Sequence, residues 1–411
     1  MTKAMTIPNG AAPGDVLELT VGEAAHGGWC VARSDAPGDQ GKVVFVRHAL
    51  PGERVRARVT SRTTRFARAE AIEILQASPD RVEPPCPYAR PDGCGGCDLQ
   101  HARPAAQRAI KAQVIRQQLR RMAGIEREVT VEALPGDPAG LGWRTRVGFA
   151  VGPDGTAGLR KHRSREVVAI ADCLIAHPLA RARDVTGRSW PGARGVEVTV
   201  SPGSGERSVA VSGPARSRGG NPRPWLTQHA AGRTWRVSAG GFWQVHPAAA
   251  GVLTEVVLAA LRPQPGDVAL DLYCGAGLFT GALAGAVGAA GLVTGVESDV
   301  AAVRDARKNL AGFPQVRVHR GDAARVLAER GLGGARLAVL DPPRTGAARE
   351  LVELLAAPGG LRRICYVSCD PATLARDLAV FARRGWRLDD LRAFDAFPMT
   401  HHVECLATLT R

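Results

Sequence analysis

The sequence contains no apolar run of the roughly 18 residues that a membrane span needs, and its N-terminus lacks a basic-then-apolar signal pattern. Acidic residues are also few, since 39 Asp and Glu face 54 Lys and Arg, and the formal net charge is +15. We therefore expect a cytoplasmic protein that does not bind through a membrane anchor. Its positive field favours a polyanionic partner, with nucleic acid the first expectation and an anionic membrane surface the second.

The chain lacks the cysteine pattern of a small disulfide-stabilised scaffold. Its 411 residues, 45% of them hydrophobic, can bury more than one core, so two or three domains are expected. Nine cysteines, an odd number, argue for thiol chemistry or metal ligation. Cys86, Cys94 and Cys97 lie within twelve residues, and Cys173 is the unassigned cysteine that could supply a fourth ligand. Thiolates alone suit both zinc and an iron–sulfur cluster, so the spacing leaves both metals open.

Short β-rich runs separated by glycine turns occupy residues 15–75 and predict a small β-barrel. Such barrels often bind single-stranded nucleic acid through a basic face. Six arginines could form that face here, or they could be a solvated strand face, because residues 1–80 carry nearly no net charge. They are Arg54, Arg56, Arg58, Arg62, Arg65 and Arg68.

The middle of the chain carries most of the positive charge, with 26 basic and 14 acidic residues in 81–262. Apolar residues at helical spacing predict an amphipathic basic helix over 104–122. Strand patterns return over 142–174, and the Gly/Pro/Arg-rich stretch 201–224 is typical of hairpin loops.

Strands alternate with helices from Val268 onward, without an internal repeat. This order predicts a mostly parallel sheet covered on both faces by helices. The expected helices cover residues 279–286, 301–310, 323–329, 348–355 and 371–381.

A glycine-containing turn, Asp271-Leu-Tyr-Cys-Gly-Ala-Gly277, follows the first of these strands and opens a helix. Glycines at such a turn let a ligand approach the backbone. The G-x-G-x-x-G dinucleotide pattern is absent, because Thr280 stands at its last position. Glu297 and Asp322 end the next two strands, and this series of acids suits an adenosyl nucleoside; the alternative is a set of ordinary helix-capping acids.

Three residues near later strand ends are candidates for chemistry. Asp341 begins Asp-Pro-Pro-Arg344 at the end of the fourth strand. Cys369 precedes Asp370-Pro371, near a helix N-terminus that is expected to stabilise a thiolate, although a free cysteine is more often inert. Glu404 follows two histidines in FPMTHHVE and is either a general base or a solvated strand end.

Taken together, the motifs resemble those of the bacterial RNA 5-methyluridine methyltransferases, which include the iron–sulfur-containing 23S rRNA (uracil-5-)-methyltransferases and the tRNA (uracil-5-)-methyltransferase. Residues 15–75 resemble the TRAM domain of this family, and CPYARPDGCGGCDLQH resembles its cluster motif. The methyltransferase motifs have counterparts in GGFWQVHP, DLYCGAG, DPPRTG, SCDPATLARDL and FPMTHHVE.

The resemblance implies roles for these residues. Cys369 would add to C6 of the target uracil, and Glu404 would later remove the C5 proton. Contacts to S-adenosylmethionine would come from Gln244, Tyr273, Glu297, Asp322 and Asp341. A 4Fe-4S cluster, with zinc as the alternative occupant, would be held by Cys86, Cys94, Cys97 and Cys173.

Three departures from the family pattern stand out. The gap after Cys86 is seven residues, a little longer than in the best-known iron–sulfur members. Leu278 stands where some members have an Asn that contacts the cofactor, and His246 stands in place of the Asn of the FxQVN pattern. The fourth-strand motif has no cysteine, unlike that of the related 5-methylcytidine enzymes, which argues for uridine.

We thus expect a flexible N-terminus (1–12), a TRAM-like OB-type β-barrel (13–77), a central basic α+β region with the cysteine cluster (78–240), and an α/β Rossmann-like methyltransferase domain (241–411). The expected function is methylation of uridine C5 in structured RNA, rRNA rather than tRNA, by a monomer that needs no obligate protein partner. The rival interpretations are a non-catalytic RNA-binding or redox-sensing iron–sulfur protein, and a methyltransferase acting on another base.

Overall fold

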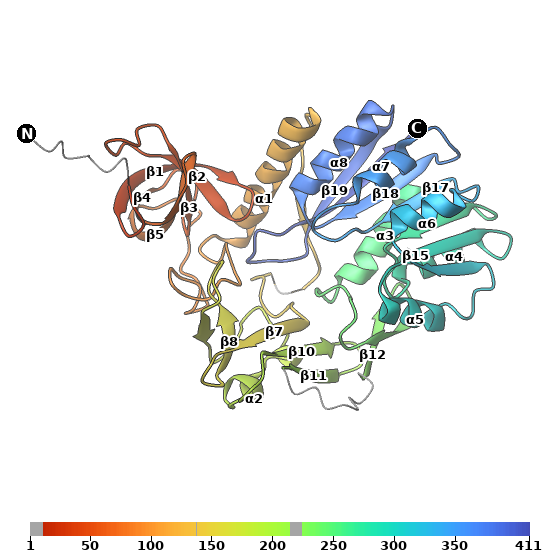
Figure 1. The fold of residues 1–411 in the computed structure, drawn as a ribbon, viewed down its shortest axis with the longest axis horizontal. Coiled ribbons are helices and arrows are strands. Elements are labelled where there is room, and N and C mark those ends of the chain that lie inside the picture. Colours follow the sequence, from red (N-terminus) through yellow and green to blue (C-terminus); the bar gives the residue numbers. More distant parts are fainter. Residues whose placement is uncertain (1–10, 137, 214–223) are drawn as a thin grey trace, which may run out of the picture. The chain divides into compact units, whose positions relative to one another are not determined.

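The computed structural model describes residues 11–136, 138–213 and 224–411 (Figure 1). The chain divides into two compact units. The first contains the described residues of Met1–Val114 with Leu159–Val168 and Pro398–His401, and the second contains the remainder. No helix in the described ranges is long and apolar enough to cross a membrane. The expectations for residues 1–10 and 214–223, a flexible start and part of a hairpin loop, lie outside the described residues.

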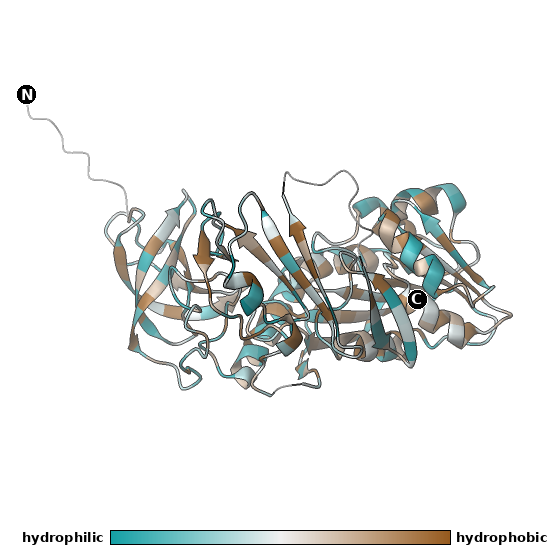
Figure 2. Ribbon diagram, turned by 90° about the horizontal axis from the view of Figure 1, so that it is seen from below, coloured by the Kyte–Doolittle hydropathy of each residue, from teal (hydrophilic) through white to brown (hydrophobic). Residues whose placement is uncertain are grey.

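The first unit contains a closed five-stranded barrel, which confirms the prediction from the sequence. Side chains alternate along β4, where Val55, Ala57 and Val59 are buried while Arg54 and Arg56 are exposed. Figure 2 shows this mixture of hydrophobic and hydrophilic residues along the barrel strands. The barrel has the order β1-β2-β3-β5-β4, formed by β1 (Val16–Ala25), β2 (Trp29–Arg33), β3 (Val43–Arg47), β4 (Arg54–Arg62) and β5 (Phe66–Gln76).

Four of the six arginines considered for a basic barrel face form ion pairs within this unit. Their carboxylate partners lie on neighbouring strands and loops, so the local positive charge is largely compensated. For these four positions the structure favours a solvated, ion-paired strand face, in which each pair contributes about 0–1 kcal/mol. The pairs are Arg54–Glu18, Arg56–Glu73, Arg58–Asp92 and Arg62–Asp39.

The amphipathic helix predicted over 104–122 is present as α1 (Pro104–Gln118), continued by a π-helical turn, η1 (Leu119–Ala123). Gly124, with φ of 65°, ends it in the left-handed conformation that glycine adopts readily. The strands predicted over 142–174 belong to a five-stranded sheet of order β11-β10-β7-β8-β9. This region contains β7 (Arg146–Val151), β8 (Ala157–Arg160), β9 (Val167–Ala169), η2 (Pro178–Ala180), α2 (Arg183–Thr186), β10 (Gly195–Ser201) and β11 (Glu206–Ser212), followed by the hairpin β12 (Trp225–Ala230) and β13 (Arg233–Ser238).

The second unit is built on an eight-stranded sheet of order β16-β15-β14-β17-β18-β20-β19-β6. The first five strands in this order, β16, β15, β14, β17 and β18, are parallel to one another, and β20 is antiparallel to β18. Strand order reverses between β14 and β17, the place where open α/β sheets bind ligands. The strands are β6 (Val131–Ala133), β14 (Val268–Leu272), β15 (Leu292–Glu297), β16 (Val316–Arg320), β17 (Leu337–Leu340), β18 (Arg363–Ser368), β19 (Arg387–Asp395) and β20 (Glu404–Thr410).

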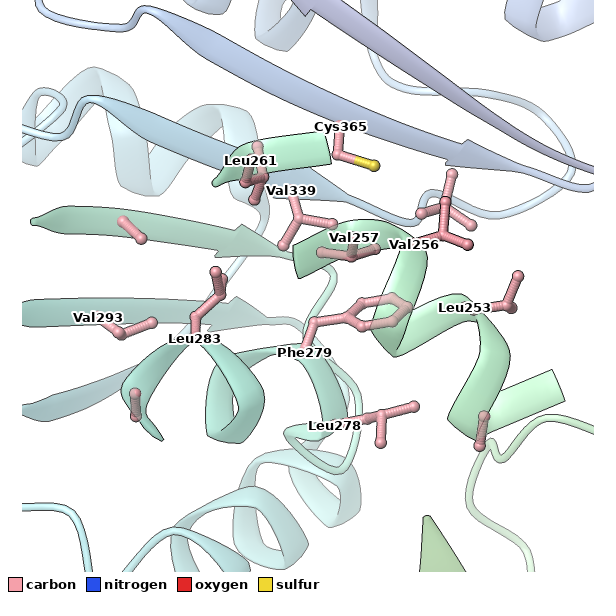
Figure 3. Packing of buried hydrophobic residues seen from close by; sticks show 14 of the residues in the cluster. Leu253, Val256, Val257, Leu261, Leu278, Phe279, Leu283, Val293, Val339 and Cys365 are labelled. Carbon is pink, nitrogen blue, oxygen red and sulfur yellow. The ribbon is translucent and has the colours of Figure 1, made fainter. Parts of the chain in front are cut away.

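The helices of this unit agree with the predicted alternation to within two residues at each end. The four-residue α2 and the longer α3 were not predicted from the sequence. Helix α3 is apolar around nearly its whole surface and lies in the core with α4 (Figure 3). Leu253 and Val257 of α3 and Phe279 and Leu283 of α4 are buried in one cluster with Val339 of the sheet. The helices are α3 (Ala249–Leu261), α4 (Leu278–Val287), α5 (Val300–Asn309), α6 (Ala323–Arg330), α7 (Arg349–Ala356) and α8 (Pro371–Arg383).

Candidate active site

The turn between β14 and α4 has an unusual backbone. Tyr273, Gly275 and Gly277 have φ values of 66°, 54° and 94°, so three residues in five are left-handed. Gly277 also packs closely, because an added Cβ would lie 2.8 Å from Leu310. An added Cβ on Gly275 would meet no atom within 4 Å. The turn is thus held against α5 at one glycine and leaves open space at the other.

Glu297, at the end of β15, is tied to this turn. Its Oε2 accepts the Gly275 N–H (3.0 Å), and its Oε1 accepts the Asp299 N–H (2.8 Å). Ser298 Oγ also donates to Oε1 (3.3 Å). A carboxylate has about four acceptor positions, so Glu297 keeps capacity for about one ribose hydroxyl. This geometry fits the nucleoside-binding role predicted from the sequence.

Asp322 and Tyr273 occupy different environments. Asp322 is exposed and caps α6, since its Oδ1 accepts the Arg325 N–H (3.0 Å). This is the capping role that the alternative interpretation assigned to it. Tyr273 is half-buried, and burial raises the pKa of its hydroxyl, while a hydrogen bond from the Ala348 backbone opposes that shift.

Asp271 is completely buried at the end of β14. Its Oδ2 accepts a hydrogen bond from Thr280 Oγ1 (2.5 Å), whereas its Oδ1 has no partner in the described part of the chain. Burial raises its pKa from 3.8 to about 7. The first acid of the glycine turn therefore stays largely protonated below neutral pH.

Cys369 and Glu404 are neighbours across two strands. Ser368, the last residue of β18, pairs with Cys405 of β20. Because these strands are antiparallel, the next position places Cys369 beside Glu404, the first residue of β20. Glu404 is buried, with 3% of its surface exposed. Thus two residues that are 35 positions apart in sequence lie side by side at the same end of neighbouring strands.

Asp341 belongs to the same group of acids. It follows β17, and its N–H donates to the Leu272 carbonyl of β14 (3.2 Å). Burial, and then the charge of Asp271, raise the pKa of Asp341 to about 7. Burial, and then Asp341, raise the pKa of Glu404 well above its usual 4.5. Asp271, Asp341 and Glu404 therefore form a group of carboxyl groups at one end of the central strands, and each has a raised pKa.

The Cys369 thiol differs from the expectation of a stabilised thiolate. Its pKa is raised to about 12, first by burial and then by Glu404. The helix N-terminus does not compensate, because Asp370 Oδ1 already accepts the N–H groups of Ala372 and Thr373 (both 2.9 Å). That part of the prediction was wrong, since partial burial and the neighbouring carboxyl groups outweigh the helix dipole.

Arg344 is a site residue that sequence reasoning missed. Its positive charge lowers the pKa of both Cys369 and Glu404, against the larger effect of burial. It ends the Asp-Pro-Pro-Arg motif that was singled out for its aspartate. The available signal for Arg344 as a site residue was its position three residues after the candidate acid Asp341.

Gln244 and His246 lie in the loop between β13 and α3. Gln244 is buried, and no hydrogen bond joins it to the other candidate residues within the described ranges. His246 Nδ1 accepts the Ala248 N–H (3.2 Å), and its ring stacks on Trp143. His246 therefore caps the turn that leads into α3, a role that an Asn side chain could also fill. Leu278, the other departure, is buried in the core with α4.

The cysteine loop lies in the first unit. Cys86 and Cys97 are each 9% exposed, and Cys94 Sγ accepts the Gly96 N–H (3.3 Å). Cys173 belongs to the second unit. Across the described ranges, no three His, Cys, Asp or Glu side chains are gathered as a metal-binding group. Thiolates suit the proposed metals chemically, and the metal site stays a prediction.

Comparisons with known proteins agree with the fold and with the family that the sequence motifs resemble. A family model described as tRNA (Uracil-5-)-methyltransferase matches residues 335–411, and a TRAM domain model matches residues 11–72. An uncharacterized RNA methyltransferase of Streptomyces avermitilis is 49% identical over 430 residues, covering 96% of this chain and 98% of the relative. A 23S rRNA (uracil(1939)-C(5))-methyltransferase of Alkalilimnicola ehrlichii is 32% identical over 445 residues, covering 97% of each chain.

A solved structure shares the architecture. The tRNA (uracil-54, C5)-methyltransferase of Pyrococcus abyssi, in complex with S-adenosyl-L-homocysteine, superposes with a TM-score of 0.71 at 22% identity and covers 96% of this chain and 100% of that one. The α/β methyltransferase fold and the TRAM barrel are thereby confirmed. With full-length relatives above 30% identity, the chain belongs to the family of S-adenosylmethionine-dependent RNA (uracil-5-)-methyltransferases.

Proposed function

We propose that this enzyme methylates C5 of a uridine in ribosomal RNA through a covalent adduct between Cys369 and C6 of the base. The observation that carries the mechanism is the placement of Cys369 beside Glu404, with Asp341 and Arg344 acting on them electrostatically. The choice of ribosomal over transfer RNA rests on the 23S rRNA specificity in the names of relatives that match nearly the whole chain. We further propose a cytoplasmic monomer without an obligate protein partner.

The glycine turn and strand ends supply a fitting site for S-adenosylmethionine. Gly275 leaves open space, and Glu297 beside it retains acceptor capacity for a ribose hydroxyl. Tyr273, Asp322 and Gln244 complete the proposed contacts. Asp341, hydrogen-bonded to Leu272 just before the glycine turn, also acts on Cys369 through its charge. The bound cofactor supplies an electrophilic methyl group on a sulfonium.

Cys369 activates the base because C5 of uracil is a poor nucleophile until a thiolate adds at C6. Formation of the new C–S bond places an electron pair on C5 and O4 as an enolate. C5 would then attack the sulfonium methyl group, and the electron pair of the broken methyl–sulfur bond would leave with S-adenosylhomocysteine. Glu404 removes the C5 proton, after which the C6–S bond breaks and returns the electron pair to the Cys369 sulfur. The reaction restores the C5–C6 double bond and needs no external electrons.

Two protons therefore need acceptors, one from the thiol and one from C5. Asp341, whose charge acts on the thiol, is the proposed acceptor of the thiol proton when it is itself ionised, and Glu404 takes the C5 proton. Arg344 opposes the accumulation of negative charge as the thiol ionises. A target uridine in folded RNA has to leave its stack to reach these groups.

The cysteines form a separate part of the proposal. We propose that Cys86, Cys94, Cys97 and Cys173 hold a 4Fe-4S cluster with a structural or RNA-orienting role, and zinc is the alternative. No step of methyl transfer depends on it. Iron and acid-labile sulfide at four atoms each per chain, after anaerobic purification, support the cluster; zinc alone supports the alternative, and neither metal refutes this ligand set.

The decisive experiment incubates anaerobically purified protein with labelled S-adenosylmethionine and undermodified total RNA, followed by nucleoside mass spectrometry of separated rRNA and tRNA. Label in 5-methyluridine from rRNA supports the proposal. Label from tRNA overturns the substrate choice, and label in another nucleoside overturns the uridine mechanism.

Substitution of Glu404 tests the covalent step. Glu404→Gln permits methyl transfer but blocks proton removal, so a protein–RNA adduct is expected to accumulate and migrate slowly on a denaturing gel. Cys369→Ala in the same background should abolish the adduct. Cys405→Ala is the matched control, because this buried thiol neighbours Glu404 without being proposed to react. Absence of any adduct from Glu404→Gln contradicts its assigned role.

A further inference from the structure

Three cations surround one tryptophan on the second unit. The guanidinium carbons of Arg236 and Arg304 lie 4.9 and 5.0 Å from the ring centroid of Trp225, and Lys308 Nζ lies 4.4 Å from it. These four residues are called the Trp225 patch. The arginines and the lysine are exposed and Trp225 is half-buried, so the charges face solvent.

The patch is built by the β12–β13 hairpin and α5. Trp225 pairs with Ser238 and Thr227 with Arg236, so Trp225 and Arg236 share one face of the hairpin. The opposite face, with Leu226 and Trp235, is buried in the core. The hairpin thereby presents Trp225 and Arg236 away from the core.

Hydrogen bonds fix α5 against this hairpin. Asn309 accepts the Arg236 N–H (2.9 Å) and donates to the Arg236 carbonyl (3.1 Å). Asp305 accepts the Ser238 N–H (2.7 Å), and Arg304 donates to Ser238 Oγ (2.7 Å). Arg304 and Lys308 are four residues apart and therefore share one helix face. The positions of the three cations follow from a rigid frame.

The arrangement concentrates positive charge. Since all three cations lie within 5.0 Å of one centroid, no two are farther apart than about 10 Å, roughly one Debye length at 0.1 M salt. Like charges at i and i+4 destabilise a helix by about 0.2–0.5 kcal/mol. Arg304 pairs with Asp305, whereas within the described ranges Arg236 and Lys308 form no ion pair.

We propose that the Trp225 patch binds the phosphate backbone of the substrate RNA, at a surface separate from the residues that react. The indole face orders the long cationic side chains before binding, which reduces the entropy lost when they contact phosphates. Binding of the polyanion relieves the repulsion among the cations and releases counterions. This inference rests on the proposed function, because it assigns an additional contact to the same RNA.

Salt dependence of RNA binding tests the patch. Arg236→Gln/Lys308→Gln removes two proposed phosphate contacts without touching Asp305. The slope of log K against log salt concentration should become shallower by about 2, or about 1 for each cation. KM for RNA should rise roughly tenfold at 0.1 M salt, with kcat at saturating RNA unchanged. Arg236→Lys/Lys308→Arg keeps both charges and should retain the wild-type slope.

The matched control is Arg330→Gln/Arg383→Gln, which removes the same charge from exposed positions on α6 and α8. An equal loss of slope in both double variants shows a general field effect and overturns the patch. Unchanged RNA binding in the patch variant also overturns it, and would leave another partner, such as an acidic protein. If the double variant fails to fold, Lys308→Glu takes its place, because it changes a single exposed residue of α5. This variant should bind RNA more weakly than the wild type. Wild-type protein that forms no 5-methyluridine on any RNA contradicts the proposed function, whatever the patch variants do.

Discussion

Protonation of Asp271 should make the stability of the second unit depend on pH. This carboxyl group is fully buried, and its pKa is about 7 in the folded chain against 3.8 as the usual value. A raised pKa means that the folded state binds the proton more tightly than the unfolded state. The stability gained from the proton is fully present below about pH 4 and is lost as pH rises through about 7.

The size of the effect follows from the two pKa values. Each unit of pKa difference is worth about 1.4 kcal/mol. Between pH 5 and about 7 the folded state holds the Asp271 proton while the unfolded state has lost it, so the two states differ by one proton over roughly two pH units. The free energy of unfolding should therefore fall by about 3 kcal/mol over this range because of Asp271. Asp271→Asn mimics the neutral acid, since its amide oxygen can accept the Thr280 hydroxyl that Asp271 Oδ2 accepts now.

Urea unfolding of the second unit, followed by circular dichroism at pH 5 and pH 8, measures this difference. Asp271→Asn should lose about 3 kcal/mol less than wild type between the two pH values. Asp267→Asn is the control, because Asp267 is only partly buried and accepts the Gln264 N–H at the entrance to the same strand. Parallel pH profiles for wild type and Asp271→Asn would refute the reasoning.

Further substitutions test the site and the core separately. Cys369→Ala should abolish turnover but change S-adenosylmethionine affinity by no more than a few fold, as measured by calorimetry; persistent 5-methyluridine formation contradicts the nucleophile assignment. The wild-type rate at saturating substrates should increase from pH 6 to 9, because burial raises the pKa of the Cys369 thiol to about 12; a rate that falls over this range argues against thiolate addition. Gly281→Ala should destabilise the enzyme by about 1–3 kcal/mol, because its Cβ would lie 2.6 Å from Trp235. Gly285→Ala on the same helix has open space and should stabilise it by roughly 0.5–1 kcal/mol, so equal melting temperatures for the two variants contradict the packing argument.

Much of the fold could be predicted because the relevant signals are local. Alternating residues such as Val55, Ala57 and Val59 marked the barrel strands, and the helix starts at Asp299 and Asp370 carry side chains that cap the first turn. The helix α3 could not be assigned in this way, because an apolar segment without a polar face has no helical periodicity to detect. Its identity as a helix depends on burial between other elements.

The candidate site shows the same division between local and long-range information. Motif positions identified Cys369, Glu404 and Asp341, but β-strand register was needed to make Cys369 and Glu404 neighbours. The role of His246 as a cap also required the geometry of the loop that precedes α3. For the arginines of β4 the sequence left two interpretations open, because it shows cations at regular spacing but not the carboxylates that pair with them from other segments.

The pKa of Cys369 depends on groups that no local motif contains. The helix that follows it is a local feature and predicts a low pKa, whereas Glu404 and Asp341 come from other strand ends and raise the pKa of this partly buried thiol. A thiol with a high pKa is largely protonated at neutral pH and therefore resists oxidation, which requires thiolate character. Once its proton is removed, the resulting thiolate is intrinsically more nucleophilic than one of low pKa. The neighbouring carboxyl groups therefore favour a cysteine that is unreactive until a base removes its proton. This suits the proposed role of Cys369 as the nucleophile that adds to C6 of a weakly electrophilic uracil.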